Sequence, residues 1–207
     1  MKTLTKEMQS AITPSMALDL LKDGNKRFVN NLKINRNLLQ QANDTSDGQH
    51  PFAVILSCID SRTSAELIFD QGLGDIFSVR IAGNIVNEDI LGSMEFGCKV
   101  AGAKIIVVLG HTKCGAVKGA CDNVTLGNLT GLIAKIKPAV DQEMTTTANR
   151  NSSNSTFVEN VAELNVSLSV KNILLKSPII AELVKNEEIT IVGGVHDIST
   201  GEVKFFE

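Results

Sequence analysis

Short uninterrupted apolar runs alternate along the chain with stretches of helical periodicity. Four runs, at 52–56, 75–81, 104–109 and 188–195, have the length of strands, and a fifth at 203–206 is expected at a sheet edge. Continuous apolar runs are typical of strands buried on both faces of a parallel sheet. The alternation therefore predicts an α/β fold, with a central, mainly parallel β-sheet flanked by helices.

Helices are predicted between these runs. In the first, at 15–31, apolar residues recur at helical spacing, and Ser15 is placed to cap it. Residues 32–50 are rich in Asn and Gln and are expected to form an irregular arm. Further helices are expected at 65–70, 88–101, 114–121, 126–143 and 156–185.

Length, composition and charge indicate the number of domains and the kind of partner. With 207 residues, 43% of them hydrophobic, the chain can build one domain with a substantial core. We expect a single domain over 1–207, in which 1–50 form an N-terminal helix and arm and 51–207 the α/β core. The net charge of -3 gives no indication of a nucleic-acid partner.

Cellular location is predicted from the cysteines and from apolar runs. The polar residues 1–13 contain no apolar leader, and no run reaches the ~18 residues of a membrane span. The four Cys are expected to be reduced thiols, because a domain of this size needs no cross-links. A cytoplasmic location without a membrane partner is therefore predicted.

Candidate chemistry gathers in two short segments. Cys58, Asp60 and Arg62 follow the first predicted strand, and His111 and Cys114 follow the third. Sites in open α/β sheets gather at the carboxyl ends of strands, so the two segments are expected to meet. Alternate residues of an extended segment share a side, which would point Cys58, Asp60 and Arg62 into one cavity. The spacing of His111 and Cys114 would put both on one face of a helix start.

Two thiols and one imidazole form a three-ligand set for Zn²⁺. Cys58, His111 and Cys114 would leave the fourth position open, as catalytic zinc sites do. Asp60 is the other candidate for that position, and as a permanent ligand it would make the site structural.

The other two cysteines and the other two histidines are not expected to bind the metal. Cys98 and Cys121 are expected to be core thiols. His196 is expected in a loop after the fourth strand. His50, near the arm, is a candidate proton shuttle.

Together, Cys58-x-Asp60-Ser61-Arg62 and His111-x-x-Cys114-Gly115 resemble the β-class carbonic anhydrases, in particular bacterial members closer to the plant-type subgroup. The resemblance extends over 17–207 and includes Phe77 to Asn84 and Gly92 to Phe96. It implies a β-carbonic anhydrase-like fold with zinc held by Cys58, His111 and Cys114. It also implies reversible hydration of CO₂ to bicarbonate and a proton through zinc-bound hydroxide.

The resemblance implies roles for further residues. Asp60 and Arg62 would form a catalytic pair beside the metal, and Asp60 could bind zinc in a closed, inactive state when that pair opens. Gln49 would bind the substrate by a hydrogen bond. Phe77 and Phe96 would line the substrate pocket, Phe96 replacing a Tyr of plant-type members.

The family also implies partners and leaves alternatives. A homodimer or a dimer of dimers is expected, with the CO₂/bicarbonate pocket at the subunit interface. Two other functions stay open: a hydrolase acting on CS₂ or COS with the same scaffold, and a non-catalytic zinc-binding interaction protein. The presence of both Asp60 and Arg62 counts against the latter, and the absence of Cys-x-x-Cys counts against a thiol redox protein.

Overall fold

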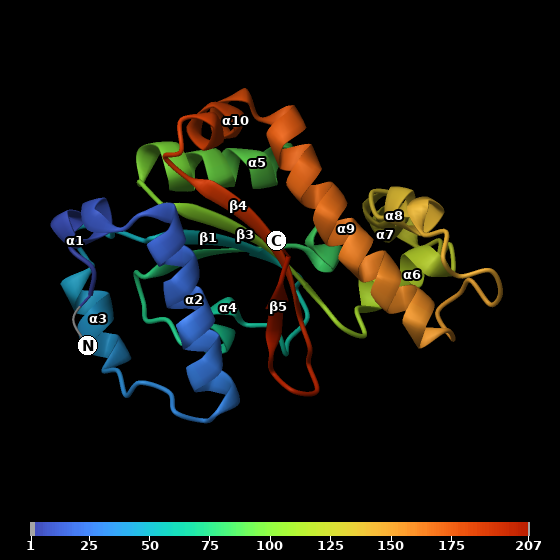
Figure 1. Ribbon diagram of the computed structural model, residues 1–207, viewed down its shortest axis with the longest axis horizontal. Coiled ribbons are helices and arrows are strands. Elements are labelled where there is room, and N and C mark those ends of the chain that lie inside the picture. The colour runs from blue at the N-terminus through green and yellow to red at the C-terminus, as the bar shows by residue number, and fades with distance from the viewer. Residues whose placement is uncertain (1–2, 207) are drawn as a thin grey trace.

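The computed structural model describes residues 3–206, and over these residues five strands form one sheet in the order β2-β1-β3-β4-β5. The strands are β1 (Ala53–Ser57), β2 (Ile76–Arg80), β3 (Ile105–His111), β4 (Thr190–His196) and β5 (Val203–Phe205). The first four are parallel, and β5 pairs antiparallel with β4 at one edge. The predicted fold class, a mainly parallel sheet with flanking helices, is confirmed (Figure 1).

Helices connect and cover these strands. The α-helices are α1 (Lys6–Ala11), α2 (Pro14–Val29), α3 (Leu38–Asp44), α4 (Ala65–Ile68), α5 (Glu88–Glu95), α6 (Gly115–Cys121), α7 (Gly127–Ile133), α8 (Lys137–Gln142), α9 (Ser155–Lys176) and α10 (Pro178–Lys185). A 3₁₀ turn, η1 (Ala82–Asn84), follows β2, and one turn of π-helix, η2 (Phe96–Val100), continues α5.

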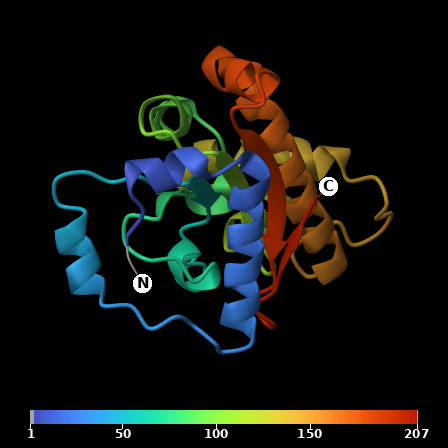
Figure 2. The ribbon, with the colours of Figure 1, turned by 60° about the vertical axis from the view of Figure 1, so that its left-hand side comes forward.

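The central strands β1 and β3 are buried along their whole length. Their side chains alternate between the two faces of the sheet. On one face, Val54 and Ile106 pack with α5, α9 and α10, and on the other, Ile55 and Val107 pack with α2 and α4. The result is a three-layer arrangement of helices, sheet and helices (Figures 1 and 2).

A third apolar cluster lies beyond the carboxyl ends of β1 and β3. It is built from α6, α7, α8 and the first half of α9, and it contains the side chains of Cys58 and Cys114. Figure 1 shows these helices gathered at one end of the molecule. The residues that follow β1 and β3 therefore enter an apolar environment.

Two predicted helices are each broken into two. The segment 126–143 forms α7 and α8, and Pro138 lies in the first turn of α8, where its missing N–H costs no hydrogen bond. The segment 156–185 forms α9 and α10, separated at Ser177. Ser177 is extended (φ -116°, ψ 98°) because it precedes Pro178, whose ring disfavours the helical conformation of the residue before it.

The amino-terminal region also departs from prediction in two details. Thr13, rather than Ser15, caps α2, with its hydroxyl accepting a hydrogen bond from the Met16 N–H. The arm at 32–50 is not irregular throughout, because it contains α3, capped by the side chain of Asn37.

Ion pairs hold this arm against the core. The buried Asp70 carboxylate accepts hydrogen bonds from Arg27 of α2 and Arg36 of the arm, each at 2.5 Å. Arg36 is itself nearly buried, with 6% of its side chain exposed. Paired charges thus anchor a segment that is poor in apolar residues.

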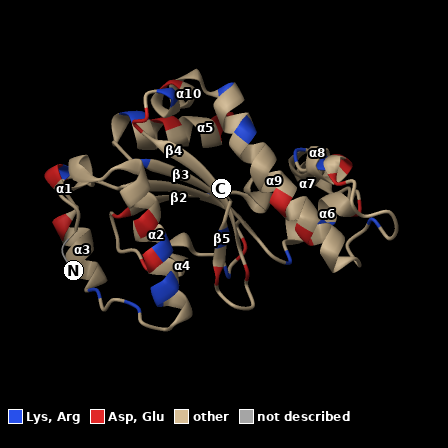
Figure 3. Ribbon diagram, in the orientation of Figure 1, with Lys and Arg blue, Asp and Glu red and all other residues tan. Residues whose placement is uncertain are grey.

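The outer surface carries charges of both signs. In the view of Figure 3, acidic and basic residues are interspersed over the helices. Among residues 3–206, no helix combines the length and the hydropathy that crossing a membrane requires.

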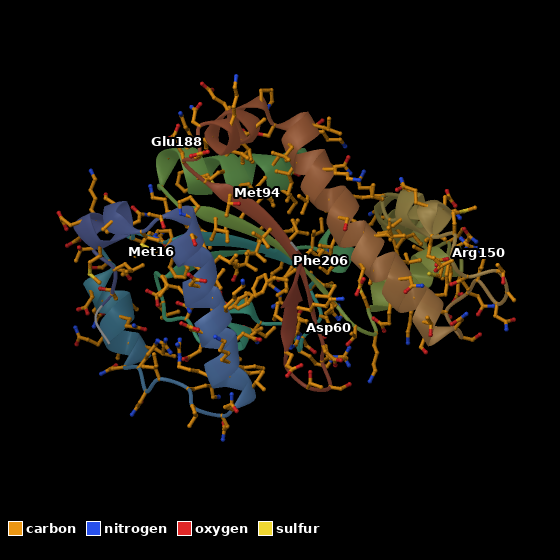
Figure 4. The ribbon with its side chains drawn as sticks, in the orientation of Figure 1. Met16, Asp60, Met94, Arg150, Glu188 and Phe206 are labelled. Atoms are coloured by element: carbon orange, nitrogen blue, oxygen red, sulfur yellow. The ribbon has the colours of Figure 1, made fainter. Side chains whose placement is uncertain are left out.

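A buried carboxylate organises the polar segment before α9. Glu143, with 1% of its side chain exposed, pairs with Arg150 at 2.7 Å. The Arg150 guanidinium lies over the ring of Phe157, 4.6 Å from its centroid, near the end of the molecule where Figure 4 labels it. Further hydrogen bonds to the Glu143 carboxylate come from Thr145, Thr146 and Asn160.

These contacts predict acid sensitivity. Burial raises the pKa of Glu143, but hydrogen bonds from Thr145, Asn160 and Thr146 outweigh it and lower the pKa to about 2, against an ordinary 4.5. The unfolded chain thus binds the proton first, so this stabilisation is present above pH 4.5 and is lost as the pH falls toward 2. In Glu143→Gln, the urea midpoint should change less steeply with pH over this range.

The matched control is Glu163→Gln, at a half-exposed carboxylate of α9. It should keep the wild-type slope. Other acid-sensitive groups are common to all three proteins. The difference between wild type and Glu143→Gln in the slope of urea midpoint against pH therefore reports on Glu143 alone. Equal slopes for wild type and Glu143→Gln would contradict the assignment.

Candidate metal centre

Three potential metal ligands meet at one end of the sheet. The ligand atoms of Cys58, His111 and Cys114 lie within 4.8 Å of one another, and all three residues are buried. Cys58 follows β1, His111 ends β3, and Cys114 precedes α6. Because β1 and β3 are adjacent and parallel, their carboxyl ends bring the two segments together.

The orientation of His111 leaves one ring nitrogen available. Its Nδ1 lies 2.9 Å from the Thr112 carbonyl oxygen, which can only accept, so Nδ1 carries the proton. Nε2 is buried and has no hydrogen-bond partner in the part of the chain that the structure describes. A backbone carbonyl that fixes the tautomer in this way is typical of metal-binding histidines.

The two thiols influence each other strongly. The Cys114 thiol lowers the pKa of Cys58, with smaller contributions from His111 and from the Gly83 N–H, which lies 3.3 Å from the Cys58 sulfur. Cys58 in turn raises the pKa of Cys114. Both thiols can therefore be ionised at neutral pH only beside a cation, which deprotonates coordinating thiols. Two sulfurs and one imidazole nitrogen fit zinc.

The other two thiols differ from this pair. Burial raises the pKa of Cys98 to about 12 and that of Cys121 to about 11. Both lie in apolar clusters, as the sequence analysis expects of core thiols. They are neutral thiols and not part of the ligand cluster.

Asp60 and Arg62 form a two-pronged ion pair beside the cluster. Arg62 Nε lies 2.9 Å from Asp60 Oδ1, and Nη2 lies 2.6 Å from Oδ2. These hydrogen bonds hold the pKa of Asp60 well below its usual value, so the carboxylate is ionised. It faces Arg62 and does not join the three grouped ligands. Figure 4 labels Asp60.

Two geometric expectations for these segments are wrong. Asp60 and Arg62 do not share one side of an extended segment; a turn, closed by the Thr63 N–H on the Asp60 carbonyl at 3.0 Å, brings them together. His111 and Cys114 do not share a helix face either. They flank a strand-to-helix turn in which Lys113 adopts a positive φ of 59°.

The sequence analysis did not identify Arg80, which ends β2. Its Nε donates to the Cys58 carbonyl at 3.0 Å and its Nη2 donates to the Asp60 carbonyl at 2.6 Å. Arg80 therefore fixes the backbone between a metal ligand and the carboxylate. A signal for Arg80 is present in the sequence: Phe77 to Arg80 alternate between apolar and polar residues, and this alternation places a cation at the end of a strand.

His196 is not in a loop as predicted. It ends β4 directly opposite His111 and is 3% exposed. Among the described residues, neither ring nitrogen has a hydrogen-bond partner. Burial, and secondarily His111, lower its pKa to about 4, so the imidazole is neutral at neutral pH. The strand continues to this residue because its backbone stays paired with β3 and β5.

Neither the three expected substrate-pocket residues nor the candidate proton shuttle His50 meets the ligand cluster within one chain. Gln49 and His50 precede β1, whereas Cys58 follows it, and the five residues of β1 span roughly 16 Å. Phe77 pairs with the first half of β1 and contacts Phe96, with ring centroids 6.1 Å apart. The structure thus separates these four residues from the metal ligands.

Sequence comparisons identify related proteins. The family model described as carbonic anhydrase matches residues 53–203. Carbonic anhydrase 2 of Mycobacterium tuberculosis is 34% identical over 189 residues, covering 91% of this chain and 90% of the relative. A carbonic anhydrase of Mycolicibacterium smegmatis is 33% identical over 197 residues, covering 92% of each.

Comparison with solved structures identifies the same family. The β-carbonic anhydrase CafA of Aspergillus fumigatus matches with a TM-score of 0.72 and 26% identity, covering 93% of this chain and 90% of that one. One of two β-carbonic anhydrases from Sordaria macrospora, described as tetrameric, matches with a TM-score of 0.68 and 26% identity, covering 78% and 83%.

The ligand cluster predicts the effect of removing one thiol. Cys58→Ala should lose zinc, with an affinity loss exceeding the roughly 10- to 100-fold typical of changes outside the ligand shell. Elemental analysis after dialysis measures the zinc content. Cys121→Ala, which removes a buried thiol outside the cluster, should retain zinc like the wild type. Full zinc content in Cys58→Ala would exclude Cys58 as a ligand.

Proposed function

Because the chain belongs to the β-class carbonic anhydrases, a family of lyases, we propose that it binds zinc and catalyses the reversible hydration of CO₂ to bicarbonate and a proton. The family resemblance inferred from the sequence is confirmed by the comparisons. The observation that carries the proposed reaction is the buried cluster of Cys58, His111 and Cys114 beside an ionised carboxylate.

Cys58, His111 and Cys114 would hold the cation, His111 through Nε2. When bound, zinc lowers the pKa of a water molecule and so supplies a hydroxide nucleophile near neutral pH. Two thiolates offset the cation's charge, so this pKa should lie above the ~7 of sites with three imidazoles. Activity should therefore rise through mildly alkaline pH.

Asp60 would orient the nucleophile. An ionised carboxylate can only accept hydrogen bonds, so it would take one from the attacking oxygen and turn a lone pair toward CO₂. Arg62 holds both carboxylate oxygens of Asp60. The planar guanidinium suits this two-pronged contact, and by occupying Asp60 it would keep the carboxylate from becoming a fourth metal ligand.

A second copy of the chain would complete the substrate pocket. Gln49, Phe77 and Phe96 lie too far from the ligands of their own chain, so we propose that they serve the site of a neighbour in a homodimer or a dimer of dimers. Exposed apolar side chains support such an interface: Ile59 is 61% exposed and Phe96 54%. The tetrameric Sordaria enzymes support an oligomer by analogy.

We also propose a cytoplasmic location. The four cysteines are free and buried, as expected of a chain in a reducing compartment.

The direct test of the proposed reaction is stopped-flow CO₂ hydration. The zinc-loaded protein should hydrate CO₂, lose this activity with a chelator and regain it with zinc, because the cation supplies the nucleophile. Zinc-loaded protein that hydrolyses COS or CS₂ but does not hydrate CO₂ would replace the proposal with that activity. No turnover of any of the three would indicate a non-catalytic zinc protein.

The role of Asp60 is tested separately. Asp60→Asn should keep zinc but lose CO₂ hydration by about 100-fold or more, because an amide has one acceptor oxygen in place of two and cannot serve both Arg62 and the attacking oxygen. Metal content and turnover are measured on the same sample. Asp23→Asn, at an exposed carboxylate of α2, should behave as wild type. Near-normal turnover of Asp60→Asn would remove Asp60 from the mechanism.

A further inference from the structure

Helix α9 contacts the turn between His111 and Cys114, and also η1, whose Gly83 contacts the Cys58 sulfur. It runs across one face of the sheet and past its carboxyl end (Figure 1), and it packs against β3, β4 and α6. Three of its polar side chains, Glu159, Asn165 and Ser169, form hydrogen bonds with the backbone of this turn and of η1.

The first set of contacts leads to the Cys58 sulfur. The Gly83 N–H donates to Cys58 Sγ at 3.3 Å. The Gly83 carbonyl accepts a hydrogen bond of 2.8 Å from Asn165 Nδ2, and Asn165 is 3% exposed. The N–H and the carbonyl belong to the two peptide planes that meet at the Gly83 α-carbon, so the Asn165 amide holds the plane next to the one that carries this N–H.

The Gly83 segment benefits from such a support because the next residue, Asn84, has a left-handed backbone conformation. Gly83 and Asn84 both have positive φ angles, 68° and 42°. This conformation costs a non-glycine residue free energy and persists only where neighbours determine it. Ser169, one helical turn after Asn165, donates to the Asn84 carbonyl at 3.3 Å. Two side chains of one helix face thus hold two consecutive carbonyls.

The second set of contacts leads to the other two ligands. Lys113, between His111 and Cys114, has a φ of 59°. Its N–H donates to Glu159 Oε1 at 3.0 Å. Lys113 is exposed, so water competes with this hydrogen bond more than with the buried one at Asn165.

We propose that Asn165 and Glu159 are positioning residues of the metal centre, which set its affinity for zinc by holding Gly83 against the Cys58 sulfur and Lys113 between the other two ligands. The inference rests on the zinc site proposed above. An N–H directed at a thiolate stabilises its charge, and partners outside the ligand shell orient ligands and tune the metal. Asn165 has the larger effect, because its hydrogen bond is buried.

Zinc affinity, measured by competition with a chromogenic chelator, tests this proposal without any assay of activity. Asn165→Ala should bind zinc about 10- to 100-fold more weakly than wild type. In protein loaded with Co²⁺, the thiolate-to-metal absorption band should shift, because Cys58 has lost a directed hydrogen bond. Ile173→Val, which removes a buried methyl group from the same helix away from the ligands, should leave both readouts unchanged.

Glu159 offers a variant at a less buried position, which should fold even where Asn165→Ala does not. Glu159→Ala should weaken zinc binding by less than about tenfold. Glu159→Gln keeps an oxygen that can accept from the Lys113 N–H and should restore wild-type affinity. Rescue by Gln distinguishes this hydrogen bond from a general charge effect.

The outcomes separate this inference from the proposed function. Failure of the wild-type chain to bind zinc would overturn the proposed zinc site. Stoichiometric zinc binding by the wild type, with unchanged affinity in folded Asn165→Ala and in Glu159→Ala, would overturn the positioning role alone. Equal weakening by Ile173→Val would also overturn it, since the effect would then follow fold stability.

Discussion

Two thiols and an imidazole converge where β1 and β3 end, and this convergence is the constraint that the rest of the site satisfies. Buried thiols so close together cannot both carry charge without a cation, and the polar backbone around them is tied in place. Arg80 holds the Cys58 and Asp60 carbonyls, and Gly83 directs its N–H at the sulfur. The apolar cluster formed by α6 to α9 contains both cysteines, and this environment strengthens electrostatic interactions in the site.

The location of this convergence could be predicted from local sequence. Uninterrupted apolar runs identify β1 and β3 as buried strands, and the carboxyl ends of parallel strands gather functional groups. Cys58 and His111 each lie two residues after such a run, so their meeting required only that the two strands be neighbours. The longer helices were also predicted from periodicity, whereas the short helices α1 and α3 were missed and the break at Ser177 depended on the weaker signal of the following proline.

The supports of the site could not be predicted in this way. Asn165 and Gly83 are 82 positions apart, and no local periodicity encodes their hydrogen bond. His196 lies opposite His111 only because β4 pairs with β3 in one particular register. The contact between Asp60 and Arg62 was expected from an extended segment and arises from a turn. In each case packing between distant segments, or a tight turn, overrides the simple spacing rule.

The length of β1 has a genetic consequence. Gln49 precedes this strand and Cys58 follows it, so in the dimer proposed above each chain would contribute the ligands of one site and the pocket wall of the other. A chain without Cys58 and a chain without Gln49 would each be inactive as a homodimer. When the two variants are expressed together, each dimer that contains one chain of each variant would have one intact site. The two defects would therefore complement each other.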